Sequence, residues 1–465
     1  MPPSISYSIT ARLELPVGGT GVGELTAAVE HAGGMVTALD VTASGAERLS
    51  MDVTCAASST EHAETIVEAL GAVPGVSVHK VSDRTFLMHL GGVIEMASKH
   101  PIRNRDDLSL VYTPGVARIC RAIADNPEDA RRLTVKRNSV AVVTDGSAVL
   151  GLGNIGPAAA LPVMEGKAAL LKRFADIDAW PLCLDTQDVD EIVRTVVAVA
   201  PGFAGINLED IGAPRCFEVE RRLREQLDIP VFHDDQHGTA IVVLAALTNA
   251  LRVVGKALPE VRIVMAGAGA AGTAVLKLLL HAGASTGAGA VTVVDVDGIV
   301  HHGRAELDPD LRWIAENTNV AGVTGKLPDA LHGADVFIGL SAPDLVDADD
   351  VATMAGDAVV FALANPEPEI DPVEARRHAA VVATGRSDHP NQINNVLAFP
   401  GVFRGLLDAC SRSITPDVLR AAAEAIARVV TDEELNANYV VPSVFHPDVH
   451  GVVAEAVTQA AQAVR

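Results

Sequence analysis

The chain has 465 residues, and its 59 Asp and Glu outnumber its 36 Lys and Arg, so that its formal net charge is −23. This negative field repels nucleic acid and anionic lipid, which excludes a general polyanion binder. Hydrophobic residues make up 49% of the chain and aromatic residues only 3%. That balance excludes disordered and collagen-like proteins and is typical of α/β proteins with aliphatic cores.

The five cysteines are scattered along the chain, and none forms a C-x-x-C pair. This pattern disfavours a disulfide framework and a thiolate zinc site, and it predicts a cytoplasmic protein. The N-terminus lacks a basic segment followed by an apolar one, and no uninterrupted apolar run reaches the length of a membrane span. We therefore expect no membrane association and interpret the longest apolar run, residues 240–247, as a buried helix.

Residues 1–88 alternate between strand-like and helix-like periodicity and predict a first domain. The expected order is β-α-β-β-α-β, the ferredoxin-like pattern, with elements at Tyr7–Pro16, Gly21–Ala32, Met35–Thr42, Arg48–Ala56, Glu61–Val73 and Val76–Met88. The segment Gly18-Gly19-Thr20-Gly21-Val22-Gly23 precedes the first helix, where free N–H groups can hold a small carboxylate. With this loop the domain resembles an ACT domain, which implies a small effector. The alternative is a module that only dimerises.

Three further segments are expected after the first domain. Residues 89–238 are mixed α/β and carry most of the polar clusters of the chain. Residues 239–430 begin with the helix Thr239–Val254 and continue as a doubly wound parallel sheet, with strands at Val261–Ala266, Ala290–Asp295, Val336–Leu340, Ala358–Ala362 and Ala380–Ala383. Ala-rich helices are expected from Pro400 onward, so that residues 431–465 form a helical C-terminal segment.

A dinucleotide-binding motif opens the doubly wound sheet. The segment Gly267-Ala268-Gly269-Ala270-Ala271-Gly272 follows a strand directly and begins the helix Thr273–Ala282. Its small residues permit a tight turn and the close approach of a pyrophosphate to the backbone. We therefore expect the cofactor to bind at Gly267, Gly269, Ala270, Ala271 and Gly272.

The second strand of this sheet ends at Asp295, whose carboxylate can accept hydrogen bonds from the adenosine ribose hydroxyls and repels a 2′-phosphate. The sequence therefore predicts NAD over NADP. Two features keep NADP open as the alternative cofactor. The spacing from Gly267 is long, because Ala284–Ala290 forms an extended loop, and Arg304 lies close enough in sequence to meet a 2′-phosphate. An aspartate that only caps a turn is the remaining interpretation.

Four apolar segments contain polar residues suited to catalysis, namely Tyr112, Lys167, the pair Glu209-Asp210 and the pair Asp234-Asp235. Glu209, Asp210 and Asp235 are hard oxygen ligands of the kind that Mg²⁺ or Mn²⁺ prefers, and they lie at strand ends where side chains can converge. Taken singly, an acidic pair more often caps a helix or a turn. The occurrence of all four segments together favours a metal site.

The order of these segments is similar to that of the malic enzyme family. The matching motifs are Tyr112-Thr-Pro-Gly-Val, Gly-Lys167, Asn-Leu-Glu209-Asp210, Phe-His-Asp-Asp235-Gln-His-Gly-Thr-Ala, Gly151–Gly156, Gly267–Gly272, Ala364–Glu369 and Asn394–Gly401. The chain resembles the short bacterial NAD-dependent form that is fused to an N-terminal ACT domain. The resemblance implies metal-dependent oxidative decarboxylation of L-malate to pyruvate and CO₂ with reduction of NAD.

The resemblance also implies the catalytic groups. Lys167 is expected to act as general base on the C2 hydroxyl, with Asp234 as a relay. Burial and a neighbouring cation disfavour the charged form of this lysine. Tyr112 is expected to protonate C3 of enolpyruvate.

Ligand sets follow from the same motifs. The ligands implied for Mg²⁺ or Mn²⁺, which would stabilise the enolate, are Glu209, Asp210 and Asp235. The asparagines implied for substrate are Asn365 and Asn395, and those implied for the cofactor are Asn365 and Asn394.

One departure concerns the substrate carboxylate. Larger members of the family place an arginine just before the Gly-Leu-Gly segment, but the corresponding position here is near Ala148. Arg118 and Arg173 are the candidates to replace it. The two histidines that flank the aspartates, His233 and His237, are expected to support or pack rather than to bind metal.

Three alternatives to an NAD-dependent malic enzyme stay open from the sequence. Within the family, a non-redox reaction would convert malate to lactate. A regulatory protein would use its ACT domain and keep a vestigial active site. Another two-domain dehydrogenase, for example one acting on an amino acid, would share the dinucleotide motif without a metal role for Glu209 and Asp210. In each case we expect a homodimer or a larger homo-oligomer, because ACT domains usually pair through their sheets.

Overall fold

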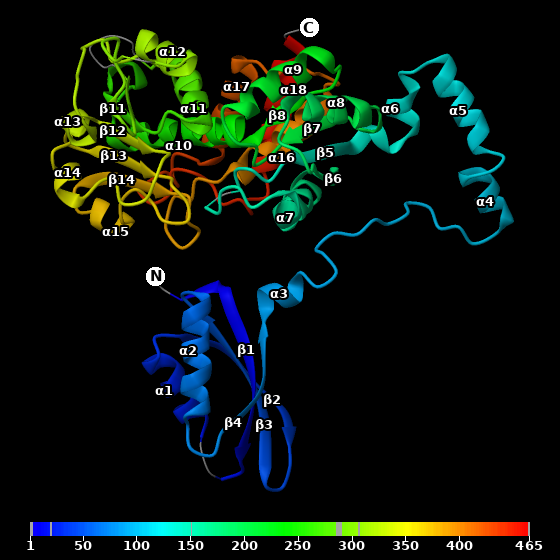
Figure 1. Ribbon diagram of the computed structural model, residues 1–465, viewed down its shortest axis with the longest axis vertical. Helices are drawn as coiled ribbons and strands as arrows, with labels where there is room; N and C mark the ends of the chain where they lie inside the picture. The colour runs from blue at the N-terminus through cyan, green and yellow to red at the C-terminus, as the bar shows by residue number, and fades with distance from the viewer. Residues whose placement is uncertain (1–2, 19–20, 150, 285–290, 306, 464–465) are drawn as a thin grey trace. The chain divides into compact units, whose positions relative to one another are not determined.

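The computed structural model describes residues 3–18, 21–149, 151–284, 291–305 and 307–463. The chain divides into two compact units, residues 1–97 and 98–465 (Figure 1). The first unit holds a four-stranded antiparallel sheet, and the second holds a parallel sheet of four strands and a mostly parallel sheet of six. Two predicted features, the loop residues 285–290 and the pair Gly19 and Thr20, lie outside the described residues.

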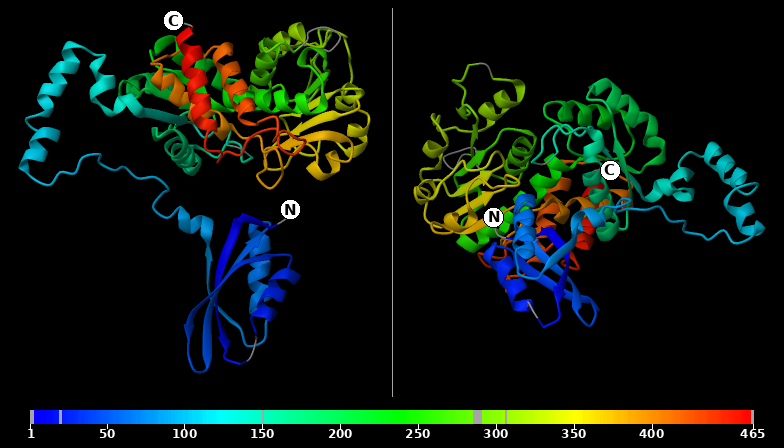
Figure 2. Two further views of the ribbon diagram at one scale, coloured as in Figure 1. Left: turned by 180° about the vertical axis from the view of Figure 1, so that it is seen from behind. Right: turned by 60° about the horizontal axis from the view of Figure 1, so that its bottom comes forward.

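The first unit has the expected β-α-β-β-α-β order. Its elements are β1 (Ser4–Pro16), α1 (Val22–His31), β2 (Met35–Ser44), β3 (Arg48–Ala57), α2 (Thr60–Gly71) and β4 (Ser77–Asp83). The antiparallel sheet has the order β2-β3-β1-β4. Alternate side chains of β1, among them Ala11 and Leu13, are buried with Leu25 of α1 and Ile66 of α2. The two helices therefore cover one face of the sheet (Figure 2).

The last predicted strand of this unit is too long. Residues 84–88 form the short helix α3 (Arg84–Met88) instead of continuing β4. The carboxylate of Asp83 accepts hydrogen bonds from the backbone N–H groups of Thr85 and Phe86. This N-cap turns the chain out of the strand, and periodicity alone does not reveal it.

The second unit begins with three short helices, α4 (Arg105–Val111), α5 (Val116–Asp125) and α6 (Asp129–Leu133). None of the residues in these fully described helices is buried. In Figures 1 and 2, α4 and α5 lie apart from the sheets of the same unit. Their apolar side chains are therefore left uncovered within the chain.

A four-stranded parallel sheet follows. Its strands β5 (Ser139–Thr144), β6 (Asp178–Cys183), β7 (Gly205–Leu208) and β8 (Val231–His233) lie in the order β6-β5-β7-β8. The connecting helices are α7 (Pro157–Ala175), α8 (Val189–Val199) and α9 (Arg215–Gln226). Every residue of β5, β7 and β8 is buried, as expected for strands covered on both faces.

The six-stranded sheet is doubly wound, as predicted. Its order is β11-β10-β9-β12-β13-β14, and its strands are β9 (Ile263–Ala266), β10 (Val291–Asp295), β11 (Gly298–Ile299), β12 (Val336–Gly339), β13 (Ala358–Ala362) and β14 (Ala379–Thr384). Only β11 pairs antiparallel. The connecting helices are α11 (Ala270–His281), α12 (Pro309–Asn317), α13 (Leu327–Leu331), α14 (Ala348–Ala352) and α15 (Pro372–Ala375). The chain changes direction across the sheet between β9 and β12, where ligands bind in such folds.

The helix α10 (Thr239–Val254) leads from the first parallel sheet to the second. Together with residues 234–238 it is long and apolar enough to cross a membrane by composition, but most of it is buried inside the protein. All residues from Ala240 to Leu247 are buried. The expected buried helix is confirmed, and its apolar character is that of a core element.

The expected helical tail is interrupted. Helices α16 (Phe399–Asp408), α17 (Pro416–Val429) and α18 (Val449–Ala463) are present, but residues 430–448 form turns and irregular chain. Two prolines, Pro442 and Pro447, lie in this stretch and cannot continue a helix. Asn391 accepts a hydrogen bond from the backbone N–H of Val440, so this irregular stretch is tied to the body of the unit.

The close packing of α16 on α18 yields a stability prediction. A Cβ atom on Gly405 would lie 2.5 Å from the carbonyl oxygen of Ala454 and 2.7 Å from Cβ of Val457. We expect Gly405→Ala to lower the free energy of unfolding by about 1–3 kcal/mol, the usual cost of overpacking. The matched control is Gly451→Ala on α18, where a Cβ meets open space and should stabilise the helix by about 0.5–1 kcal/mol. Urea unfolding measures both, and equal effects of the two variants would contradict the packing.

Candidate active site

The predicted carboxylates converge at the carboxyl ends of two neighbouring strands. Glu209 and Asp210 follow β7, and Asp235 follows β8 by one further residue. Parallel pairing places Leu208 opposite His233, so the residues that come next lie together. One carboxylate oxygen from each of Glu209, Asp210 and Asp235 lies within 4.8 Å of the others.

Local backbone geometry shapes this cluster. Residues 234–238 form a single π-helical turn before α10, a feature common at functional sites. A Cβ on Gly238 would lie 2.0 Å from Oδ1 of Asp234, so only glycine leaves room for that carboxylate. Asp210 has a φ of +53°, which is costly for a side chain and typical of strained functional positions. Its backbone N–H donates to Oδ2 of Asp235 at 3.0 Å.

Lys167 reaches the cluster from α7. It lies on the buried stripe of that helix, which also carries Ala160, Met164, Ala168 and Leu171. Its Nζ donates to Oδ2 of Asp234 at 2.6 Å and lies 2.9 Å from Oε1 of Glu209. The same ammonium lies 4.4 Å from the centre of the Phe399 ring, which shields it from water and adds a cation–π interaction.

The charges of the cluster shift one another's pKa values. Burial raises the pKa of Glu209 well above its usual value, and Lys167 only partly offsets this effect. Burial, with the nearby Asp235, raises the pKa of Asp210 to about 7. Burial also favours the neutral amine of Lys167, but the carboxylates of Asp234 and Glu209 outweigh it and hold the pKa of Lys167 above its usual value. The two carboxylates, rather than burial, therefore set the direction of this shift.

The donor set fits a divalent cation. Oδ2 of Asp210 is buried and has no hydrogen-bond partner among the described atoms. An uncompensated buried carboxylate oxygen is costly unless a cation or a donor approaches it. Three carboxylates and no cysteine suit Mg²⁺ or Mn²⁺ rather than a softer metal. Glu209, Asp210 and Asp235 are the residues that would hold the ion.

A second, buried network of hydrogen bonds lies next to the carboxylate cluster. Glu220 of α9 accepts hydrogen bonds from His237 at 2.6 Å and from Nε2 of Gln236 at 3.0 Å. His233 Nε2 lies 3.2 Å from Oδ2 of Asp235 and, despite burial, helps to hold the pKa of Asp235 below its usual value. Both histidines therefore support the acidic residues, in line with the prediction. Sequence reasoning missed Glu220, whose only signal was its i+4 partner Arg224 on the same helix.

The three predicted asparagines differ in what they contact. Asn395 donates from Nδ2 to Oδ2 of Asp234 at 3.2 Å, which places it at the Lys167 cluster. Asn394 uses its Oδ1 to cap the next turn through the N–H of Val396. A Cβ on Gly151 would lie 3.4 Å from the carbonyl oxygen of Asn365, so the loop after β5 meets the loop after β13.

The dinucleotide motif has the expected form. Gly267 has a φ of +117°, and a Cβ there would lie 2.6 Å from the carbonyl oxygen of Leu340 at the end of β12. A Cβ on Gly272 would lie 2.0 Å from the carbonyl oxygen of Gly267. Both positions require glycine. The helix α11 begins at Ala270, three residues earlier than predicted, so the motif supplies its first turn, whose free N–H groups are of the kind that bind a pyrophosphate.

A further positioning residue escaped prediction. The buried carboxylate of Glu369 accepts hydrogen bonds from the backbone N–H groups of Ser341 and Ala364. These donors follow β12 and β13, so one side chain fixes two of the loops at the carboxyl edge of the sheet. A Cβ on Gly339 would lie 2.3 Å from the carboxyl carbon of Glu369. The Ala364–Glu369 motif was noticed, but the role of its last residue needed the structure.

Tyr112 is not brought to this cluster within the chain. It follows α4, and its side chain is 66% exposed. In Figures 1 and 2, α4 and α5 lie apart from α7, which carries Lys167. Arg118 lies on the same exposed α5. Arg173 packs over the ring of Phe174, so neither arginine is placed at the carboxylate cluster.

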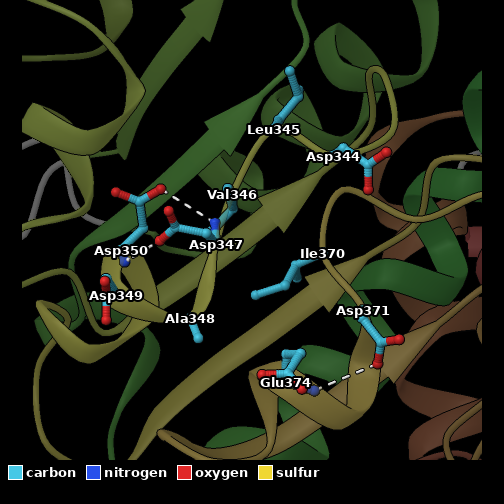
Figure 3. Close-up of a pocket in the computed structure, with 10 residues that line it drawn as sticks. All are labelled: Asp344, Leu345, Val346, Asp347, Ala348, Asp349, Asp350, Ile370, Asp371 and Glu374. Atoms are coloured by element: carbon cyan, nitrogen blue, oxygen red, sulfur yellow. Dashed lines mark hydrogen bonds between the residues drawn. The ribbon is translucent and has the colours of Figure 1, made fainter.

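A separate acidic pocket lies beside the six-stranded sheet, around α14 and α15 (Figure 3). Three of its five aspartates take part in helix capping: Asp347 forms a capping box with Asp350, and Asp371 caps α15. The residues that line it include none of the predicted site residues. Helix capping accounts for these three carboxylates.

Comparison with known proteins agrees with this geometry. Residues 91–224 match the malic enzyme N-terminal domain and residues 236–462 match the malic enzyme NAD-binding domain. The chain is 53% identical to the NAD-dependent malic enzyme of Geobacillus stearothermophilus over 99% of this chain and 96% of that protein. It is 51% identical to the bifunctional malic/malolactic enzyme of Bacillus subtilis over 80% and 90%, respectively. The crystal structure of the NAD-dependent malic enzyme of Thermotoga maritima superposes with a TM-score of 0.77 at 48% identity, covering 81% of this chain and 99% of that one. The chain therefore belongs to the malic enzyme family.

Proposed function

We propose that the protein catalyses oxidative decarboxylation of L-malate to pyruvate and CO₂, with reduction of NAD and dependence on Mg²⁺ or Mn²⁺. The observation that carries this proposal is the contact of Lys167 with Asp234 and Glu209 beside two further carboxylates. A buried lysine next to a metal-type donor set suits removal of a hydroxyl proton and stabilisation of the resulting negative charge.

Groups absent from the chain would supply two parts of the chemistry: a divalent cation stabilises charge on the substrate oxygens, and NAD accepts the hydride. The chain supplies proton transfer. Lys167 Nζ donates to Asp234 Oδ2, 2.6 Å away, so it can first pass a proton to this carboxylate and then, as a neutral amine, take the proton of the C2 hydroxyl. Asn395 holds the same carboxylate in place through its Nδ2. The ring of Phe399 lies against Lys167 Nζ, and the lysine side chain is only 12% exposed, which limits the loss of the proton to solvent.

This proposal predicts the effect of removing the base. Lys167→Ala should lower the rate of NAD reduction with L-malate and Mn²⁺ by about 100-fold or more, the usual contribution of a general base. The control is Lys172→Ala on the same helix, whose ammonium is 53% exposed and pairs with Asp176 and Asp178. A chelator should abolish the activity of the unmodified enzyme.

The same assay separates the alternatives. Lactate formation from malate without net NAD reduction would favour the non-redox reaction, which the malic/malolactic relative makes the second candidate. Chelator-resistant oxidation of an amino acid would contradict the metal role of Glu209 and Asp210. No turnover of malate at all would favour a regulatory protein.

We further propose that the protein acts as a homodimer or larger homo-oligomer in which a second copy supplies Tyr112. Within the chain α4 and α5 have no buried residue, although they carry large apolar side chains that are more than one-third exposed, namely Leu108, Leu110, Val111, Tyr112 and Ile119. Exposed apolar surface of this kind marks an interface. Enolpyruvate needs a proton at C3, and the Lys167 cluster holds no phenol among the described contacts. The segment formed by α4 and α5 in a second copy of the chain would supply this phenol from its Tyr112.

Mixed oligomers test the origin of the tyrosine. Tyr112→Phe and Lys167→Ala should each be inactive alone, whereas co-expression should restore about one quarter of the activity of the unmodified enzyme, because half the dimers are mixed and one site in each is intact. The control pair, Lys167→Ala with Asp234→Asn, removes two groups that touch within one chain and should restore nothing. If co-expression of the first pair restored no activity, each active site would use the Tyr112 of its own chain. A light-scattering mass of one chain would exclude the oligomer.

We also propose that the first unit is an ACT-type domain that binds a small carboxylate effector. The support is its ferredoxin-like strand order and the position of Gly21 directly before α1. Gly23→Asp tests it, because a Cβ at this position meets open space and the added charge repels an anion at the helix start. Calorimetric titration with amino acids and C4 dicarboxylates should give a ligand that the variant binds about tenfold more weakly. No heat with any of them would favour a domain that only dimerises.

We place the enzyme in the cytoplasm. Cys55, Cys120, Cys183 and Cys216 are free thiols, the state that a reducing compartment maintains. Among the described residues, the one helix with the length and composition of a membrane span is mostly buried in the protein. Both observations support this location.

A further inference from the structure

The carboxylate at the end of β10 is already occupied by groups of the chain. Oδ1 of Asp295 accepts the backbone N–H of Asp297 at 2.9 Å. Oδ2 of Asp295 accepts Nη1 of Arg304, also at 2.9 Å. The second terminal nitrogen of Arg304, Nη2, lies 3.3 Å from Oδ2 of Asp297. One guanidinium therefore bridges two carboxylates.

This bridge lies beside the dinucleotide motif. β10 pairs with β9 so that Val294 is opposite Ala266, and the N–H of Gly267 donates to the carbonyl oxygen of Val294 at 2.8 Å. The next residue, Asp295, is the one that meets the adenosine ribose in folds of this kind. A guanidinium bonded to its carboxylate is thus within reach of the ribose 2′ position.

The two partners of Arg304 differ in burial. The side chains of Arg304 and Asp295 are 16% and 11% exposed, whereas that of Asp297 is 76% exposed. The buried pair is weakly screened by solvent and the outer contact is strongly screened. Arg304 is therefore held mainly by Asp295, and three of its five N–H donors have no partner in this bridge.

We propose that Arg304 is a cofactor-selecting residue: a 2′-phosphate-binding guanidinium that Asp295 holds in an ion pair. With Asp295 charged, a 2′-phosphate has to displace that carboxylate and lie beside it, so NAD is selected. Once the charge of Asp295 is removed, Arg304 can give a phosphate the paired hydrogen bonds that its planar fork provides. The inference deepens the proposed function, because it explains which nicotinamide cofactor the enzyme takes.

The test compares Asp295→Asn with Asp295→Asn/Arg304→Gln. Asparagine keeps the size of the side chain and its acceptor oxygen but removes the repulsion. We expect Asp295→Asn to raise the ratio of kcat/KM for NADP over NAD by about 100-fold, and the added Arg304→Gln to reverse about tenfold or more of that gain, the range for hydrogen bonds to charged groups. The matched control adds Arg312→Gln instead, because Arg312 bonds only to the carbonyl oxygen of Leu307 in the described structure; it should keep the gain.

Binding measurements separate this inference from the catalytic one. Adenosine 2′,5′-bisphosphate and 5′-AMP report the 2′-phosphate without any turnover of malate. In calorimetry, Asp295→Asn should bind the bisphosphate about tenfold or more tightly than the unmodified protein does, and the Arg304→Gln double variant should lose this gain. Equal affinity of the single and double variants for the bisphosphate would overturn the role of Arg304. If Arg304→Gln weakened the binding of the bisphosphate and of 5′-AMP equally, the role of Arg304 would be only to hold the loop after β11 in place.

Discussion

A lysine held between two buried carboxylates is the interaction on which the active site depends. Glu209, Asp210, Asp234 and Asp235 carry negative charge into a small volume at the ends of β7 and β8. Such a cluster repels itself and loses hydration, so it needs positive charge nearby. Lys167 provides one such charge through Asp234 and Glu209. The buried Asp210 oxygen that stays without a partner marks where a second positive charge, a divalent cation, would be accommodated.

The two parallel sheets place this charge cluster against the cofactor motif. The first sheet delivers the carboxylates from its strand ends, and α10 leads directly from the Asp234–Gly238 turn to the second sheet. The second sheet reverses its winding between β9 and β12, where Gly267 passes against Leu340. The residues of the proton-transfer cluster and of the dinucleotide motif therefore belong to a continuous, buried framework. Such rigidity keeps a reacting carbon close to its hydride acceptor.

Local patterns in the sequence predicted most elements because apolar periodicity and glycine positions are local signals. The buried helix Thr239–Val254 was predicted with the bounds that the structure has, and the acidic residues were placed at strand ends. Contacts between distant residues had no such signal. Lys167 and Asp234 are 67 residues apart, and the support of the site by Glu220 depends on the packing of α9. Tyr112 is separate from the cluster because α4 and α5 do not pack against the sheets of their unit. Local sequence patterns carry no information on such packing.

The most direct test of this account is a crystal of the full chain grown with Mn²⁺, examined by anomalous diffraction at the manganese edge. The account predicts one manganese peak bound by carboxylate oxygens of Glu209, Asp210 and Asp235. A peak at another group of residues would contradict it. So would a catalytically active crystal with no manganese at these three carboxylates.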